Sequence, residues 1–380
     1  MGIMLRDLNW SVTVSTIACT QCGALYPERK TPYQCDCGGV FDYVEFPEYQ
    51  GKGASARGLW AYLDNPGFWA GKPSVSLGEG STPLIQVPFG GLPLWLKMES
   101  ANPTGSYKDR GSTTLVSFLK DREVTYAVED SSGNAGASFA AYCARGALRC
   151  KVFVPESASG PKRTQIEMFG AELVRVPGPR SEAARAVLAE ANSGAVYGSH
   201  AFMPFGLPGI ATIAYEIVEQ LGSVPASVIA PVGHGGLLYG VMRGFEAMKE
   251  AGVIQEEPMY IGAQAAACAP VAAGYYAGVA SPKAITPGET IAEGVKVAVP
   301  ARGAAILSRM REGKGQMLSI TEESLRQAYV EMAHAGVYCE PTSALVWAAA
   351  SSMEKDSKKP TVAIITGSGY KSVLNLTGIV

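Results

Sequence analysis

The chain has 380 residues, of which 47% are apolar and 17% charged, and its formal net charge is −2. A charged fraction this low argues against disorder, and without a long basic run neither nucleic acid nor an acidic membrane surface is an expected partner. No stretch reaches the roughly 18 consecutive apolar residues that a membrane span needs. Because residues 1–15 also lack the layout of a signal peptide, we expect a cytoplasmic protein.

Four cysteines near the N-terminus follow a spacing typical of a metal-binding ribbon. They are Cys19, Cys22, Cys35 and Cys37, which form Cys-x2-Cys and Cys-x-Cys pairs. Four thiolates at this spacing can close tetrahedrally on zinc, and a reducing cytosol disfavours disulfides. We therefore predict a zinc-ribbon-like segment over residues 1–45 with a structural zinc. The alternative is a ribbon that folds without metal.

From Leu92 onward, apolar strands alternate with amphipathic helices. The predicted strands are 92–98, 124–129, 148–155, 171–176, 195–198, 227–232, 259–263 and 361–365. The predicted helices are 112–119, 135–145, 162–169 and 181–191. Such alternation predicts an α/β fold with parallel sheets and right-handed crossovers. We expect two open, mostly parallel sheet domains that face a shared cleft, the large one from 46–100 and 203–380 and the small one from 101–202.

The loop after the first of these strands holds a lysine in a turn. It reads NPTGSYKDRG from Asn102 to Gly111, and Pro103 and Gly105 make a turn that would hold Lys108 at the end of the strand. A lysine there is a phosphate clamp, a solvated surface charge or an amine nucleophile. Desolvation favours the last, because it lowers the lysine pKa and frees the lone pair.

Three later loops also follow predicted strands, at the sheet edge where α/β folds bind ligands. Residues 131–136 read SSGNAG, and their small side chains let backbone N–H groups point at an anion such as a substrate carboxylate. Residues 231–237 read PVGHGGL, and their glycines allow close backbone approach to a phosphate. His234 in this loop either contacts that phosphate or caps the turn. Residues 366–369 read TGSG and offer a hydroxyl.

Six blocks of the chain together resemble a known family. In order they are LGEGSTPL, ESANPTGSYKDRG, SSGNAG, PVGHGGLL, CEPTSA and ITGSGYK. They are similar to the motifs of fold-type II pyridoxal-phosphate enzymes, whose fold is that of the tryptophan synthase β subunit, and especially to those of threonine synthases. The resemblance implies a pyridoxal 5′-phosphate-dependent carbon–oxygen lyase that converts a small amino acid, O-phosphohomoserine, with water into threonine and phosphate. It also implies a homodimer.

The resemblance further implies a role for each matching residue. Lys108 would hold the cofactor covalently and move the substrate's α-proton, and Asn134 would bond to the cofactor's ring hydroxyl. Thr366 would face the pyridine nitrogen, where a neutral hydroxyl does not force that nitrogen to be protonated. The cofactor phosphate would be bound by Gly233, His234, Gly235, Gly236 and Leu237. The substrate carboxylate would be bound by Ser131, Ser132, Gly133 and Ala135.

The chain departs from threonine synthases where many of them place a phosphate-binding arginine. Here the matching positions are Phe205, Gly206 and Leu207, which offer no charge-assisted hydrogen bond. Lys162 and Arg163 are the nearest basic pair in the same series of strands, and we expect them to be surface charges. The alternatives are therefore a serine/threonine dehydratase-like or cysteate-synthase-like elimination or replacement enzyme of the same fold, or a non-catalytic sensor that binds pyridoxal phosphate.

Overall fold

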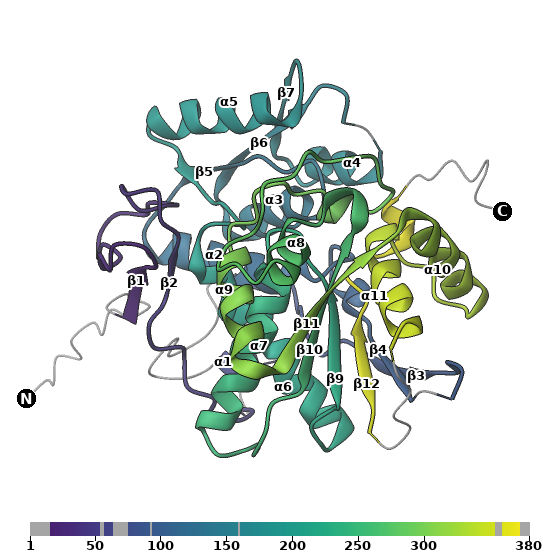
Figure 1. Cartoon of the computed structure of the whole chain (residues 1–380). Coiled ribbons are helices and arrows are strands. Elements are labelled where there is room, and N and C mark those ends of the chain that lie inside the picture. The colour runs from purple at the N-terminus through teal and green to yellow at the C-terminus, as the bar shows by residue number, and fades with distance from the viewer. Residues whose placement is uncertain are drawn as a thin grey trace, which may run out of the picture.

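The computed structural model describes residues 16–53, 57–63, 75–91, 93–158, 160–353 and 359–372. Residues 1–15, in which no signal peptide is expected, lie outside the described residues, as does Leu92 at the start of the first predicted strand. Two open sheets make up the body of the molecule, and a short two-stranded ribbon lies at one side (Figure 1). The predicted α/β class with two mostly parallel sheets is confirmed. The domain boundaries predicted near residues 45, 100 and 202 stay a prediction.

The large sheet has the strand order β11-β10-β9-β12-β4-β3. Its strands are β3 (Leu84–Val87), β4 (Leu94–Lys97), β9 (Ser227–Pro231), β10 (Met259–Ala265), β11 (Gly315–Ile320) and β12 (Thr361–Ile364). All neighbours are parallel except β3, which runs antiparallel to β4 at the edge. The sequence pattern predicted four of these strands and neither β3 nor β11.

Helices cover both faces of the large sheet. Val228 and Ala230 of β9 pack in the hydrophobic core that includes α6 (Leu207–Leu221) and α7 (Gly236–Glu250). Ile229 points the other way, into the core formed with α11 (Pro341–Ser351). Burial on both faces explains why the central strands are continuous apolar runs. The remaining helices of this half are α1 (Trp60–Leu63), α8 (Pro270–Tyr276), α9 (Gly303–Arg309) and α10 (Glu322–His334).

The small sheet has the order β7-β6-β5-β8, and all its strands are parallel. Its strands are β5 (Tyr126–Glu129), β6 (Arg149–Pro155), β7 (Glu172–Val176) and β8 (Val196–Tyr197). The accompanying helices are α2 (Lys108–Asp121), α3 (Asn134–Gly146), α4 (Pro161–Met168) and α5 (Arg180–Asn192). All eight elements match predicted ones. However, α2 begins at Lys108 itself, so the lysine occupies the first turn of a helix and does not lie in the turn before it.

The N-terminal ribbon pairs β1 (Ile17–Cys19) antiparallel to β2 (Phe41–Tyr43). The ring of Tyr26 lies 5.0 Å from that of Phe205 and 6.1 Å from that of Phe118, so an aromatic cluster joins the ribbon to the main body. Within the described segments, no helix is both long enough and apolar enough to cross a membrane.

Candidate active site

The loop that leads into α2 and the loop that follows β12 are hydrogen-bonded side by side. Tyr107 N donates to Thr366 O, and Ser368 N donates to Gly105 O, both at 3.0 Å. Gly105 has a φ of +82°, and a Cβ there would lie 3.0 Å from Lys371 Cδ, so the turn needs glycine. The paired loops place the start of α2, and with it Lys108, beside the Thr366 loop.

A buried carboxylate fixes the first turn of α2. Asp109 is fully buried and accepts hydrogen bonds from the Thr104 backbone N and hydroxyl, each at 2.6 Å, and from the Ser138 hydroxyl at 2.6 Å. Burial raises the pKa of Asp109 to about 6, although these hydrogen bonds act to lower it. The helix start that carries Lys108 is thus tied to both the preceding loop and α3.

Below that turn lies a buried ionic network. Arg110 is fully buried and pairs with Glu99 at 2.6 Å and with Glu216 of α6 at 2.8 Å. Lys97 of β4 pairs with the same Glu216 at 2.6 Å. Thr82, in the LGEGSTPL block, donates its hydroxyl to Glu99 at 2.7 Å. Several motif residues singled out by the family resemblance are therefore structural supports of the lysine loop.

Lys108 itself is partly buried, and its Nζ lies 4.9 Å from the centre of the Tyr107 ring. Two imidazoles lie near its charge. Burial, followed by the charge of Lys108, holds the pKa of His200 well below its ordinary value. Burial also holds the pKa of His234 well below its ordinary value, with the charges of Arg180 and Lys108 acting in the same direction. Both imidazoles are therefore neutral at pH 7.

Asn134 begins α3 and contacts a carboxylate that the sequence analysis missed. Its Nδ2 donates to Glu340 at 2.8 Å, whereas its Oδ1 is buried without a partner. Glu340 also accepts from Thr366 Oγ1 at 2.9 Å and from Lys162 Nζ at 3.1 Å. The side chain of Lys162 is 23% exposed, so the expectation that it is a surface charge is wrong. Arg163, by contrast, donates to the carbonyl oxygen of Ala158.

The loop before α7 is closely packed at Gly233 and Gly235 but leaves free space at Gly236, where the helix begins. A Cβ at Gly233 would lie 2.9 Å from Gly294 O, and one at Gly235, where φ is +94°, would lie 2.8 Å from Ile306 Cδ1. A Cβ at Gly236 would meet nothing within 4 Å. No side chain caps α7, so its first N–H groups are available to an anion. His234 Nδ1 is buried without a partner, so it does not cap the turn.

The SSGNAG loop also ends at an uncapped helix N-terminus. No side chain caps α3, and Gly133 N donates to Ser131 Oγ at 3.3 Å. A Cβ at Gly136 would lie 1.8 Å from Ser131 O, which explains why this position lacks a side chain. Ser132 is partly exposed, and Ala135 is buried. The N–H groups in the first turn of α3 are therefore donors that no side chain of the loop caps.

A second unpredicted cluster lies at the end of β5. Glu129 is fully buried and contacts His200 Nδ1, and the His200 ring lies 5.7 Å from that of His234 in a perpendicular arrangement. The next residue, Asp130, accepts from the Tyr197 hydroxyl at 2.7 Å. Burial raises the pKa of Glu129 to about 7. The cluster joins two carboxyl groups to two neutral imidazoles close to the lysine.

The stretch where threonine synthases often carry an arginine lies in the core. Phe205 is 1% exposed and stacks on Phe118 with ring centres 3.4 Å apart. A Cβ at Gly206 would lie 3.4 Å from Gly111 Cα, and Leu207 is buried. None of these three positions offers a charged donor, because two are buried apolar side chains and the third is glycine.

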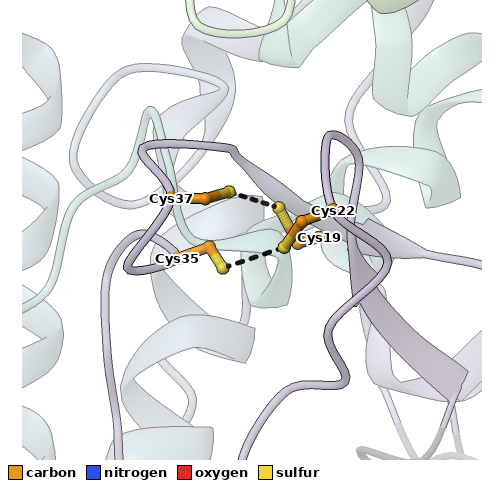
Figure 2. Close-up of side chains that lie close together, drawn as sticks. All are labelled: Cys19, Cys22, Cys35 and Cys37. Carbon is orange, nitrogen blue, oxygen red and sulfur yellow. Dashed lines mark hydrogen bonds between the residues drawn. The ribbon is translucent and has the colours of Figure 1, made fainter.

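The four ribbon cysteines come together although they are separated in sequence. Their Sγ atoms all lie within 4.8 Å of one another (Figure 2). Cys19 and Cys37 approach to 3.5 Å, and Cys22 and Cys35 to 3.6 Å. A set of four thiols at this separation fits the donor set of a tetrahedral metal.

Comparisons with known proteins agree with this arrangement. A family model described as pyridoxal-phosphate dependent enzyme matches residues 75–367. A threonine synthase of Methanocaldococcus jannaschii is 32% identical over 93% of this chain and 92% of its own length. A threonine synthase of Synechocystis is 32% identical over 79% of each chain.

Solved structures share the fold. A threonine deaminase from T.th. has a TM-score of 0.66 and 25% identity, covering 77% of this chain and 94% of its own. Maize serine racemase has a TM-score of 0.68 and 21% identity, covering 78% and 90%. The chain therefore belongs to the pyridoxal-phosphate dependent enzyme family, and threonine synthases are among its relatives over most of its length.

Proposed function

We propose that this chain is a pyridoxal-phosphate-dependent carbon–oxygen lyase of the threonine synthase type, with O-phosphohomoserine and water as substrates and threonine and phosphate as products. The observation that carries the proposal is the pairing of the Lys108 loop with the Thr366 loop, in a chain that is 32% identical to a threonine synthase over 93% of its length. An activated lysine and a helix N-terminus open to phosphate are what this cofactor requires.

The residues around the lysine fit the cofactor. When bound, pyridoxal phosphate supplies an electron sink. Lys108 would hold it covalently and then move the substrate's α-proton. The unpaired amide oxygen of Asn134 and the unpaired Nδ1 of His234 are buried polar atoms that need partners. Gly236 leaves open space at the uncapped start of α7, where the cofactor phosphate would accept hydrogen bonds from the N–H groups of Gly233–Leu237.

The substrate would be held by the start of α3. Residues Ser131, Ser132, Gly133 and Ala135 precede or begin this helix, and its free N–H groups suit a carboxylate. The side chain of Asn134 would face the cofactor's ring hydroxyl, with its Nδ2 already directed by Glu340. This division gives the cofactor and the substrate separate helix N-termini, those of α7 and α3.

The experiment begins with the purified protein. It should be yellow, and borohydride reduction followed by peptide mapping should place the pyridoxyl group on Lys108. Lys120→Ala, in the last turn of the same helix, serves as the matched control for Lys108→Ala. A colourless protein that takes up no added cofactor, or a label on another lysine, would contradict the assignment of Lys108 as the residue that holds the cofactor. Phosphate, ammonia and 2-oxo-acid release are then measured separately on O-phosphohomoserine, serine and threonine.

A second function is favoured by one observation. Phe205 and Leu207, two of the three positions where an arginine would read the substrate phosphate, are buried, and the carboxyl group of Glu129 lies within electrostatic range of the lysine. Carboxylates repel a phosphate dianion, so a dehydratase-like or cysteate-synthase-like reaction on an unphosphorylated or differently substituted amino acid is the second candidate. Release of ammonia and 2-oxo acid from serine or threonine, without phosphate release from O-phosphohomoserine, would select it.

The cysteine cluster supports a structural zinc. Cys19, Cys22, Cys35 and Cys37 would fill all four positions of the metal and leave none for substrate, so the zinc would have no part in the reaction. Elemental analysis of protein purified without chelators should find one zinc per chain. We also propose a cytoplasmic homodimer, and sedimentation equilibrium measures its mass.

A further inference from the structure

Arg302 is a buried arginine to which the roles proposed above give no task. It immediately precedes α9, beside the ribbon strand β2 (Figure 1). Its guanidinium pairs with Asp42 of β2 at 3.6 Å and donates to the carbonyl oxygen of Phe41 at 3.4 Å. It also donates to the carbonyl oxygens of Phe202 and Met203, at 3.2 and 3.4 Å. One side chain therefore joins the ribbon to the loop that follows β8.

The backbone of Arg302 contacts the loop proposed to bind the cofactor phosphate. Its N–H group donates to the carbonyl oxygen of His234 at 3.0 Å. A Cβ at Gly235 would lie 3.4 Å from the Cβ of Arg302, so the loop packs closely against this residue. Arg302 thus contacts the ribbon through its side chain and the phosphate loop through its backbone.

A second buried arginine connects the same two parts of the molecule. Arg243 lies on α7, the helix that begins in the phosphate loop. Its Nη1 donates to the carbonyl oxygen of Tyr43 at 3.2 Å and lies 4.0 Å from Asp42 Oδ1. The buried carboxylate of Asp42 therefore faces two guanidinium groups, one beside the phosphate loop and one on the helix that follows it.

The ribbon strand that carries Asp42 is paired directly with the cysteine cluster. Phe41 of β2 lies opposite Cys19 of β1, and Cys19 is one of the four clustered cysteines. A structural metal supplies folding free energy to the segment that binds it, so removal of the metal loosens that segment. A loosened β2 would leave Arg302 without its carboxylate and without the Phe41 carbonyl. The ribbon is therefore an element with two states, ordered with metal and loosened without it.

We propose that Arg302 is a positioning residue that couples metal binding by the ribbon to cofactor binding by the loop before α7. Both sites belong to the proposed function, on which this inference rests. With metal bound, β2 holds Arg302, and Arg302 holds His234 and Gly235 in the conformation that receives the cofactor phosphate. Coupling between two sites is reciprocal, so zinc and pyridoxal phosphate should raise each other's affinity by the same factor. The metal takes no part in the reaction, because its effect is on cofactor affinity alone.

The first test uses the wild-type protein. Pyridoxal phosphate is removed and then titrated back into zinc-loaded protein and into protein stripped of zinc, and binding is followed by the absorbance of the adduct on Lys108. Circular dichroism checks that both forms stay folded. We expect the Kd for pyridoxal phosphate to be about 5-fold higher or more without zinc. Competition with a chromophoric chelator should give a zinc affinity that is higher by the same factor when the cofactor is bound. Equal cofactor affinities with and without zinc overturn the inference.

Two variants that retain the cysteines test the route of the coupling, and they cover the case in which the metal-free protein does not stay folded. Arg302→Met removes the guanidinium, and with zinc bound it should bind the cofactor as weakly as the metal-free wild type. Asp42→Asn keeps the oxygen that accepts from Tyr43 N at 2.8 Å but removes the charge that faces Arg302. In both variants the zinc affinity should no longer depend on the cofactor. A coupling factor unchanged from the wild type in both of them overturns the inference.

Arg122→Met is the matched control. Arg122 follows α2 and, like Arg302, donates to carbonyl oxygens of the ribbon, those of Pro27 and Glu28. Among the described residues, its guanidinium makes no hydrogen bond to the phosphate loop. This variant should keep the wild-type coupling factor, and an equal loss in it would assign the effect to ribbon docking in general and overturn the role of Arg302. Failure of the wild type to bind the cofactor on Lys108, or to contain zinc, would instead overturn the proposed function or the zinc assignment, and the inference with it.

Discussion

Replacing Glu216 with glutamine tests the ionic network beneath the lysine loop. Glu216 is 3% exposed and is the shared partner of Arg110, at 2.8 Å, and Lys97, at 2.6 Å, both of which are fully buried. Glutamine keeps the volume but removes the charge, so Arg110 keeps only Glu99 as an ion-pair partner, and Lys97 keeps only neutral acceptors. Removing one partner of a buried ion pair costs about 3–5 kcal/mol, and we expect the free energy of unfolding to fall by that amount at pH 7.

The pKa of Glu216 gives an independent value. Burial acts to raise it, but the Arg110 guanidinium and then Lys97 lower it from 4.5 to about 2. At 1.36 kcal/mol per pKa unit, this corresponds to about 3 kcal/mol of stability. Because the unfolded state takes up the proton first, this stability is fully present above about pH 4.5 and is lost as the pH falls toward 2. The difference between wild type and variant should shrink over that window.

Urea unfolding followed by circular dichroism, repeated at several pH values, measures both effects. The matched control is Glu256→Gln, which breaks an ion pair with Lys359 of 3.2 Å whose side chains are 64% and 60% exposed. A surface pair of this kind contributes about 0–1 kcal/mol. If Glu216→Gln costs no more than the control, or if its cost is the same at pH 7 and at low pH, the network does not stabilise the lysine loop as argued.

Three further outcomes are expected. Lys162→Ala should raise the KM for O-phosphohomoserine more than the KM for serine. Arg163→Ala should not, because the Arg163 guanidinium donates to a carbonyl oxygen. Equal effects of Lys162→Ala on both substrates would mean that Lys162 does not bind the substrate phosphate and serves only in its ion pair with Glu340. Phe205→Arg should lower the free energy of unfolding by about 3 kcal/mol or more without improving phosphate release, because the position is 1% exposed and its ring is stacked. Cys22→Ser and Cys35→Ser should lower the unfolding temperature, and a chelator that stopped turnover at once while the fold stayed intact would contradict a structural zinc.

The strands were predictable where burial on both faces requires a continuous run of apolar residues. β9 and β12 are buried on both faces, and their predicted and observed limits agree within a residue. β11, with the sequence GQMLSI, mixes polar and apolar residues because it lies at the sheet edge and is only partly buried. β3 lies at the opposite edge, where two of its four residues are exposed. These two edge strands of the large sheet were therefore missed by a pattern that detects burial, whereas β7 and β8, at the edges of the small sheet, were predicted.

The site was predictable only where its chemistry is local in the sequence. Lys108, Asn134 and Thr366 each lie in a short motif that follows a strand, and the fold brings these strand ends together. Their partners are not local. Glu340 is 206 residues from Asn134, and the Glu129–His200 contact spans 71 residues. Glu340 lies in the CEPTSA block, but that block was given no role in the site, and Glu129 lies in no block, so the tertiary contacts identify both carboxyl groups as partners.

Lys162 shows why the local sequence misleads where a contact is made only in the tertiary structure. A lysine on a short helix with one buried residue is usually solvated, and the sequence favoured that interpretation. In the structure α4 of the small-sheet half carries this lysine to Glu340 at the start of α11 in the large-sheet half. The same carboxylate accepts hydrogen bonds from Asn134 and Thr366. The Lys162–Glu340 pair therefore joins α4 to α11, and no pattern within α4 predicts that contact.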